Sequence, residues 1–314
     1  MTHSLRRTVI VTIATLCATA QAPAQHADLS GIWNSATATP LERPARLKDK
    51  LFFTPQEAAD FERRAAARNV ESESESRSQN VGTYNTAWRE FGLKIVKTLR
   101  TSIVTDPPDG RIPPLTPAAA AEKRRRMDLL RHPNSSKDLG LQDQCVSFTT
   151  AVPPMIPYSY NSNYQFIQTA HELVIQVEMI HDSRIIRLDG RPHLPSNVRL
   201  WLGDSIGHWE GATLVVDTAN FNDGPGYFGD AGGMFGTDRN LHVVERFNLL
   251  DATTLLYSFE VDDPTAYTRP WKGELTMARA AGPIYEYACH EGNYALPNLL
   301  NAFRAGERGP GANR

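Results

Sequence analysis

Short runs in which apolar and polar residues alternate dominate the chain from residue 164 onward. Turn residues separate these runs, and no long segment of helical periodicity lies between them, which is typical of antiparallel strands rather than of a parallel α/β sheet. Most of the connections have hairpin length. The pattern predicts strands over residues 164–169, 173–180, 184–188, 213–221, 241–249, 254–262, 272–279 and 284–289.

Residues 28–150 follow a different pattern. Two Ala-rich segments with basic C-terminal halves begin at Thr54 and Thr116, and each threonine is followed by proline. Threonine is a favoured N-cap and proline a favoured first helical residue, so helices are predicted over 54–69 and 116–131. The low-complexity segment between them, residues 71–80, is expected to be mobile.

Together these elements predict a mainly β fold: an antiparallel lipocalin/calycin-like β-barrel with a helical N-terminal extension. The Gly-x-Trp spacing in residues 28–34, DLSGIWN, also opens many lipocalin-like barrels. We expect a helical and irregular N-terminal region over 25–150 that packs on the barrel. The barrel itself is expected over 151–296, and a flexible tail over 297–314.

The first residues indicate the compartment. A basic start, an apolar run of about a dozen residues and small residues around Ala20 and Ala24 predict a secretory signal peptide over 1–24. Arg6-Arg7 leaves the twin-arginine route open. The expected location is therefore periplasmic or extracellular. No later run is long enough to span a bilayer.

Composition narrows the partners and the covalent links. The net charge of −2 gives no sign of a nucleic-acid surface, so a small-molecule ligand or substrate is the expected partner. Removal of the signal peptide leaves two cysteines, Cys145 and Cys289. An even count in an oxidising compartment predicts one disulfide, and two separate buried thiols are the alternative.

Several long motifs carry a resemblance. Residues 178–195 (EMIHDSRIIRLDGRPHLP), 201–221 (WLGDSIGHWEGATLVVDTANF) and 285–294 (YEYACHEGNY) resemble a large family of exported, mostly uncharacterised bacterial proteins. The resemblance covers most of the mature chain and implies export. It implies no activity that can be carried over residue by residue, so the candidate chemistry comes from the residues themselves.

The segment 178–193 concentrates ionisable groups at the end of a predicted strand. His181 or His193 could act as a general base with a nearby carboxylate that orients the ring, and for His181 that carboxylate is Asp182 or Asp217. Strand alternation would put Asp182 and Arg184 on one face and His181 on the other. The arginines that could hold a substrate carboxylate or an oxyanion are Arg184, Arg187 and Arg191. The alternative is a set of structural ion pairs at a barrel rim.

The other half of a site must come from distant strands. Asp217 lies in an apolar run, where a carboxylate is costly to bury without a partner. His242 and His290 are further catalytic candidates, and alternation would place His290 beside Glu286. The remaining substrate-binding candidates are Trp209, from the cluster with Asp204 and His208, together with Asn220 and Glu286.

These residues predict an exported β-barrel that binds a partly apolar small molecule. Whether it also transforms that molecule is open; if it does, the residues favour metal-independent acid/base chemistry, that of a lyase, isomerase, cyclase or hydrolase. No metal-ligand spacing and no cofactor motif occurs, so neither a metal nor a cofactor is expected. One alternative is a non-catalytic periplasmic carrier, which a pocket lined by aliphatic and aromatic groups would favour. Another is an interaction module that acts through an exposed apolar face of 54–69 or 116–131.

Overall fold

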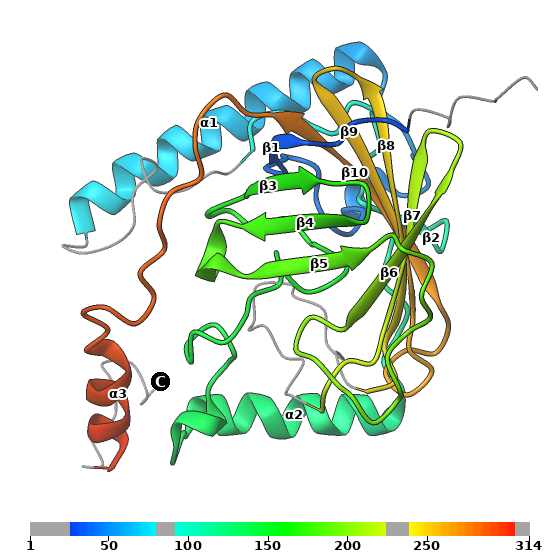
Figure 1. Ribbon diagram of the computed structural model, residues 1–314. Coiled ribbons are helices and arrows are strands. Elements are labelled where there is room, and N and C mark those ends of the chain that lie inside the picture. Colours follow the sequence, from blue (N-terminus) through cyan, green and yellow to red (C-terminus); the bar gives the residue numbers. More distant parts are fainter. Residues whose placement is uncertain (1–25, 80–91, 224–238, 305–314) are drawn as a thin grey trace, which may run out of the picture.

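Ten strands form one sheet in the computed structural model, which describes residues 26–79, 92–223 and 239–304. Their order is β1-β3-β4-β5-β6-β7-β8-β9-β10-β2, and β1 also pairs with β10. All strands but β2 therefore close into a barrel (Figure 1). Their bounds are β1 (Gly31–Asn34), β2 (Val104–Asp106), β3 (Asn163–Gln168), β4 (Glu172–Val177), β5 (Ser183–Arg187), β6 (Asp204–Glu210), β7 (Thr213–Ala219), β8 (His242–Asp251), β9 (Thr254–Asp262) and β10 (Trp271–Arg279).

The predicted strands form, except the last. Residues 284–289 make no strand, because β10 already pairs with β9 and β1 and the closed barrel leaves no edge to extend. Among the strands beyond residue 160, β6 is the one that the alternation pattern did not predict. Its Gly207 lets the neighbouring side chains close in, since a Cβ there would lie 2.8 Å from Leu188 and 3.0 Å from Ile186.

The sequence predicts a purely antiparallel sheet, and the structure corrects this. β5 and β6 run parallel, with Ile186 opposite Ser205, and every other neighbouring pair is antiparallel. A parallel pair needs a long connection that returns the chain to the same end of the sheet. Residues 188–203 make that connection, and they carry part of the candidate site described below.

Side chains fill the interior of the barrel. Aromatic residues from several strands are almost fully buried there, among them Trp33, Tyr164, Tyr257 and Trp271. The packing is close enough that a Cβ on Gly273 would lie 2.3 Å from the Phe259 ring. The barrel is thus a packed hydrophobic core rather than an open cup.

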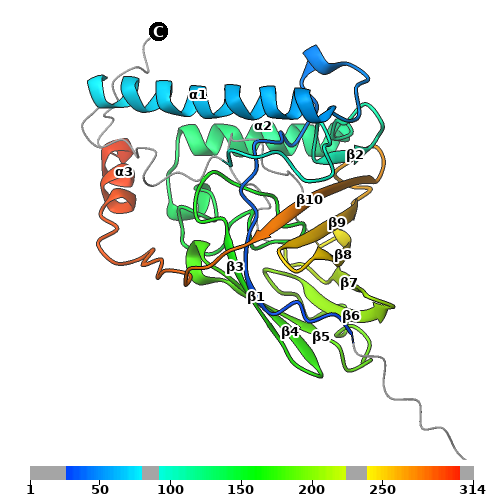
Figure 2. The same ribbon diagram turned by 90° about the horizontal axis from the view of Figure 1, so that it is seen from above.

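Both predicted helix starts are confirmed. Thr54 and Glu57 form a reciprocal capping box at the start of α1 (Pro55–Gln79), and the Thr116 hydroxyl accepts a hydrogen bond from the Ala119 N–H at the start of α2 (Pro117–Arg131). α1 continues through residues 71–79, where a mobile segment was expected, because Glu and Arg readily extend a helix that has already nucleated. Both helices lie outside the barrel (Figure 2).

Shorter helices complete the described chain. They are η1 (Ala45–Leu47), η2 (Ser136–Asp138), η3 (Met179–His181) and α3 (Ala295–Arg304). α3 occupies part of the predicted flexible tail, so residues 297–304 are helical. The barrel is not confined to residues 151–296, because β1 comes from the N-terminal region and pairs with both β3 and β10. None of the described helices is long and apolar enough to cross a membrane. The predicted signal peptide lies outside the described residues.

Candidate functional site

A continuous line of charged side chains crosses the outer face of the barrel from β5 to β8. Arg187 on β5 contacts Asp204 on β6, with Nη2 2.9 Å from Oδ1. His193, in the 188–203 connection, places Nδ1 2.9 Å from Asp204 Oδ2 and Nε2 2.9 Å from Asp217 Oδ1 on β7. His242 on β8 places Nε2 3.0 Å from both oxygens of Asp217. We call these five side chains the charged line.

Strand alternation explains why the line lies outside. On β7, Val216 and Thr218 are fully buried in the barrel, so Asp217 between them points outward. On β8, Val243 and Glu245 are fully buried, so His242 also points outward. Tight antiparallel pairing of β7 and β8 then brings the two outward side chains within hydrogen-bond distance.

The buried end of the line is held by several donors. Burial raises the pKa of Asp204, but the Leu194 N–H, the His193 ring and Arg187 outweigh it and hold that pKa below its usual value. The Leu194 N–H lies 2.8 Å from Asp204 Oδ2, and Asn220 Nδ2 donates to the Leu194 carbonyl. His193 and Leu194 are therefore fixed on the sheet, and Asn220 supports the connection rather than pointing to a ligand.

The other end of the line is accessible. The His242 side chain is 42% exposed, and Asp217 is 39% exposed. The hydrogen bond from His242, aided by that from His193, lowers the pKa of Asp217. Asp217 in turn raises the pKa of His242 above its usual 6.5, and the nearby charges of Asp262 and Glu260 act in the same direction. His242 is thus a solvent-accessible imidazole whose charged form is stabilised by a fixed carboxylate.

This coupling has a measurable consequence. The pKa of His242, followed by NMR of its ring protons, should lie above 6.5 and should fall toward 6.5 in Asp217→Asn. Because the folded-state pKa is raised, the stability that this pair contributes is fully present below about pH 6.5 and is lost as the pH rises through the folded value. A His242 pKa that is unchanged by Asp217→Asn would contradict the coupling.

Arg184 lies elsewhere, inside the barrel. Its guanidinium forms an ion pair with Glu245, and the two side chains are 1% and 0% exposed. The hydroxyls of Ser205, Thr218 and Tyr257 complete the network, at distances of 3.0, 2.8 and 2.7 Å from their charged partners. The network has no exposed atom to offer a substrate, so Arg184 is not a substrate-binding residue. Glu245 is likewise inside the barrel, although its place beside Arg246 in the sequence predicts a cross-strand pair on the sheet surface.

His181 and Asp182 do not join the charged line. They occupy the turn around η3, where His181 has a φ of 57° and strand alternation no longer applies. His181 Nδ1 accepts the Tyr287 N–H at 3.0 Å, and Asp182 accepts the Ser147 hydroxyl at 2.8 Å. Burial raises the pKa of Asp182 despite the Ser147 hydrogen bond. The predicted pairing of His181 as base with Asp182 as orienter is therefore not formed.

The remaining candidates are scattered. Arg191 pairs with Asp189 in an exposed turn, and Trp209 stacks on His26 with ring centroids 4.8 Å apart. Glu286 and His290 lie in the irregular segment after β10, so the strand alternation that placed them on one face does not exist. The Gly-rich residues 224–236 that follow Asn220 lie outside the described residues. Cys145 and Cys289 are bonded, as predicted, with their Cα atoms 5.8 Å apart.

Sequence reasoning did not assign two residues that matter. Asp204 is one of them: its place in the cluster with His208 and Trp209 predicts no role, whereas in the structure it holds His193 and Leu194 of the 188–203 connection on the sheet. Glu245 is the other, because a glutamate between Val244 and Arg246 has the pattern of a surface residue, and only its buried arginine partner places it inside the barrel.

The described residues contain no group of three or more His, Cys, Asp or Glu side chains arranged to hold a metal ion. Comparison of the chain with models of known protein families, with curated proteins and with solved structures found no match.

Proposed function

We propose that this protein is an exported β-barrel enzyme that transfers protons without a metal, with His242 as the group that exchanges a proton with the substrate. The observation that carries the proposal is the position of Asp217 between two imidazoles, hydrogen bonded to His193 on one side and to the accessible His242 on the other. Perturbed titratable groups fixed by one another on an accessible surface are typical of acid/base sites.

Each member of the charged line has a role in this chemistry. Asp217 orients the His242 ring through Nε2 and stabilises its protonated form, as the aspartate of a catalytic triad does for its histidine. The hydrogen bond at Nε2 leaves Nδ1 to face the substrate. In the protonated form Nδ1 donates to a developing negative charge, and in the neutral form it accepts a proton from water or from an acidic C–H bond.

His193 acts as the support of Asp217. Its two ring nitrogens each lie 2.9 Å from a different aspartate, so the ring links Asp217 to Asp204. Arg187 and the Leu194 N–H hold Asp204 on the far side. Asp217 is thus fixed from both ends, which limits its reorganisation during proton transfer.

The surroundings favour a substrate with an apolar body. The 188–203 connection that carries His193 also exposes Leu194, Val198, Leu200 and Trp201, with 37–46% of each residue accessible. An exposed apolar group next to a charged line is well suited to a molecule that is apolar at one end and polar at the reacting end.

The same structure weighs against the two alternatives. A lipocalin-like carrier needs an internal cavity, whereas aromatic side chains and the Arg184–Glu245 network occupy the interior of this barrel. An interaction module was expected to show a large apolar face on the two predicted helices. No large hydrophobic residue is exposed in the described side chains of α1, residues 55–68, or of α2.

Export is part of the proposal. The basic and apolar start of the chain supports it, as does the resemblance of the long motifs to exported bacterial proteins. The Cys145–Cys289 disulfide is compatible with an oxidising compartment.

The test uses two probes of proton transfer, hydrolysis of p-nitrophenyl butyrate and deuterium exchange next to the carbonyl of cyclohexanone. We expect the mature protein to accelerate at least one of them and His242→Gln to lose about 100-fold or more of that rate, since a positioned acid or base contributes about 10²–10⁴-fold. Asp217→Asn should also shift the pH–rate profile to lower pH, because it removes the carboxylate that raises the His242 pKa.

His208→Gln is the matched control. His208 lies on β6 on the same outer face, and among the described residues its ring has a polar contact with Glu210 and with no residue of the charged line. It should keep the full rate. Dialysis against EDTA should also leave the rate unchanged. A His242→Gln variant as active as the wild type, or no acceleration of either probe, would refute the proposal.

A further inference from the structure

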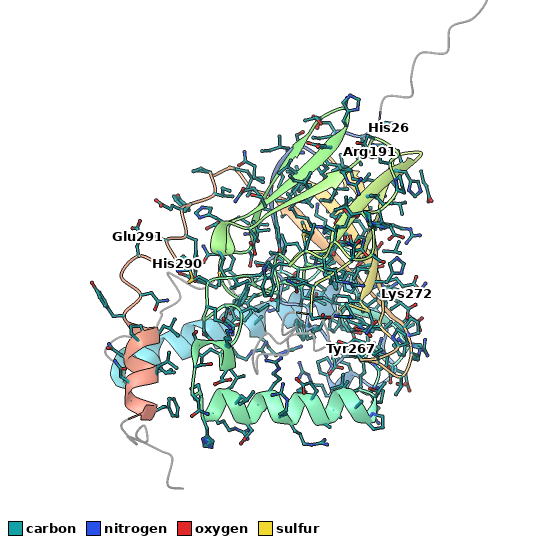
Figure 3. All side chains as sticks on the ribbon, turned by 60° about the horizontal axis from the view of Figure 1, so that its bottom comes forward. His26, Arg191, Tyr267, Lys272, His290 and Glu291 are labelled. Carbon is teal, nitrogen blue, oxygen red and sulfur yellow. A yellow bond between two sulfur atoms is a disulfide. The ribbon has the colours of Figure 1, made fainter. Side chains whose placement is uncertain are left out.

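A cavity lies beside the disulfide, and none of its described lining residues belongs to the charged line. The cavity, of about 720 Å³, lies between the end of α2, the turn over 139–143 and the C-terminal segment that leads to α3. This volume is in the range of small-molecule sites. Figure 3 labels His290 and Glu291 in this C-terminal segment.

The walls of the cavity are held together by specific contacts. Cys289 lines the cavity and is bonded to Cys145, which fixes the C-terminal segment against the 139–145 turn. The Tyr287 N–H donates to His181 Nδ1, and the Tyr287 ring packs against the edge of Tyr160 with centroids 6.3 Å apart. The covalent bond and these contacts form the cavity from parts of the chain that are distant in sequence, so it does not depend on one mobile loop.

The charged side chains among the described lining residues of the cavity are all acidic. Asp143, Glu286 and Glu291 line it, and no lysine, arginine or histidine is among its described lining residues. None of the three carboxylates forms an ion pair with a described residue, whereas Asp204, Asp217 and Glu245 are all paired. Burial raises the pKa of Asp143, which only the Gly140 N–H opposes. Among the described lining residues, the cavity thus offers acidic groups and no cation to offset them.

The rest of the lining is apolar or aromatic. Leu130 and Leu139 contribute from one side and Leu296 and Leu299 from the other, with the rings of Tyr160 and Tyr287 between the two. Aromatic rings and carboxylates together are the environment that recognises an organic ammonium group, through charge and through cation–π contact. The three carboxylates are not arranged around one point to hold a metal ion, as the described residues include no such group.

We propose that this cavity binds an organic ammonium ion with an apolar body, with the cationic end near Asp143 and Glu286 and the apolar body against the leucines. The site is independent of the proton-transfer function, because it shares no residue with the charged line.

The proposal is tested by calorimetric titration of the intact mature protein with three probes of similar shape: 2-phenylethylammonium, the neutral 2-phenylethanol and the anionic 3-phenylpropionate. We expect the ammonium ion to bind about tenfold or more tightly than the alcohol, the anion not to bind, and added salt to weaken the binding. Asp143→Asn with Glu286→Gln should weaken binding of the ammonium ion about tenfold or more.

Two variants serve as controls. Glu210→Gln removes an exposed glutamate of β6 and should bind as the wild type does, and so should His242→Gln, which separates this site from the charged line. Circular dichroism shows whether the double variant is folded. Equal binding of the alcohol and the ammonium ion would overturn the proposal. So would tighter binding of Ca²⁺ at the same carboxylates, unchanged binding by the double variant, or no binding of the ammonium ion at about 10 mM.

Discussion

Replacement of Arg184 by methionine is expected to lower the free energy of unfolding by about 3–5 kcal/mol. The variant leaves the Glu245 carboxylate fully buried in the barrel without its cation, and it also removes the donors to Ser205 and Thr218. Removing one partner of a buried pair costs more than the pair contributes, because the remaining charge has no water around it. Denaturant unfolding followed by tryptophan fluorescence measures the loss.

The double variant Arg184→Met with Glu245→Leu shows how much of the lost free energy of unfolding comes from the unpaired charge of Glu245. Both charges are then absent, so most of the lost stability should return, although the Ser205, Thr218 and Tyr257 hydroxyls lose partners. Arg246→Met is the matched control, since Arg246 is exposed on the same strand as Glu245, and it should change the stability by no more than about 0.5 kcal/mol. A double variant as unstable as Arg184→Met alone would contradict this account.

Removal of the disulfide is expected to have an effect of similar size. Cys145 and Cys289 are separated by 144 positions, and closing a loop of that length stabilises the folded state by about 4–5 kcal/mol in the chain-entropy model. The double replacement Cys145→Ser with Cys289→Ser should therefore lower the free energy of unfolding by up to this amount. Reduction of the wild-type protein should give the same shift.

Limited proteolysis locates the change. The disulfide anchors the segment that contains Tyr285 and Tyr294, which are 67% and 75% exposed. Chymotrypsin should cut this segment first in the double serine variant, while the barrel persists as a stable fragment. Addition of a reductant to the serine variant is the control and should change nothing. Equal resistance of the oxidised and reduced proteins would show that the segment is held without the disulfide.

Local pattern predicted much of the fold because the relevant information is local. The alternation in residues 254–262 coincides with β9, and the Thr-Pro starts coincide with α1 and α2. The cysteine count predicted the disulfide, because only two of the three cysteines lie beyond the predicted signal peptide. By contrast, residues 284–289 have the composition of a strand but form none, since a strand also needs a free edge to pair with.

The candidate site depended on partners that are distant in the chain. Asp217 and His242 were both predicted as catalytic, but their contact follows from the register of β7 and β8. His193 reaches Asp217 only because β5 and β6 are parallel, which sends the 188–203 connection across the outer face of the sheet. No spacing in the sequence encodes that crossing.

The sequence by itself determined which residues alternate and which residue types are available for proton transfer. Only the tertiary structure decided which face of each strand is inside. Alternation places Arg184 and Arg187 on opposite faces of β5 but does not say which face is inside; the structure puts Arg184 in the core with Glu245 and Arg187 on the outer face with Asp204. The physical reason is that a charge is tolerated inside only when its partner arrives from another strand, and barrel closure brings the two together.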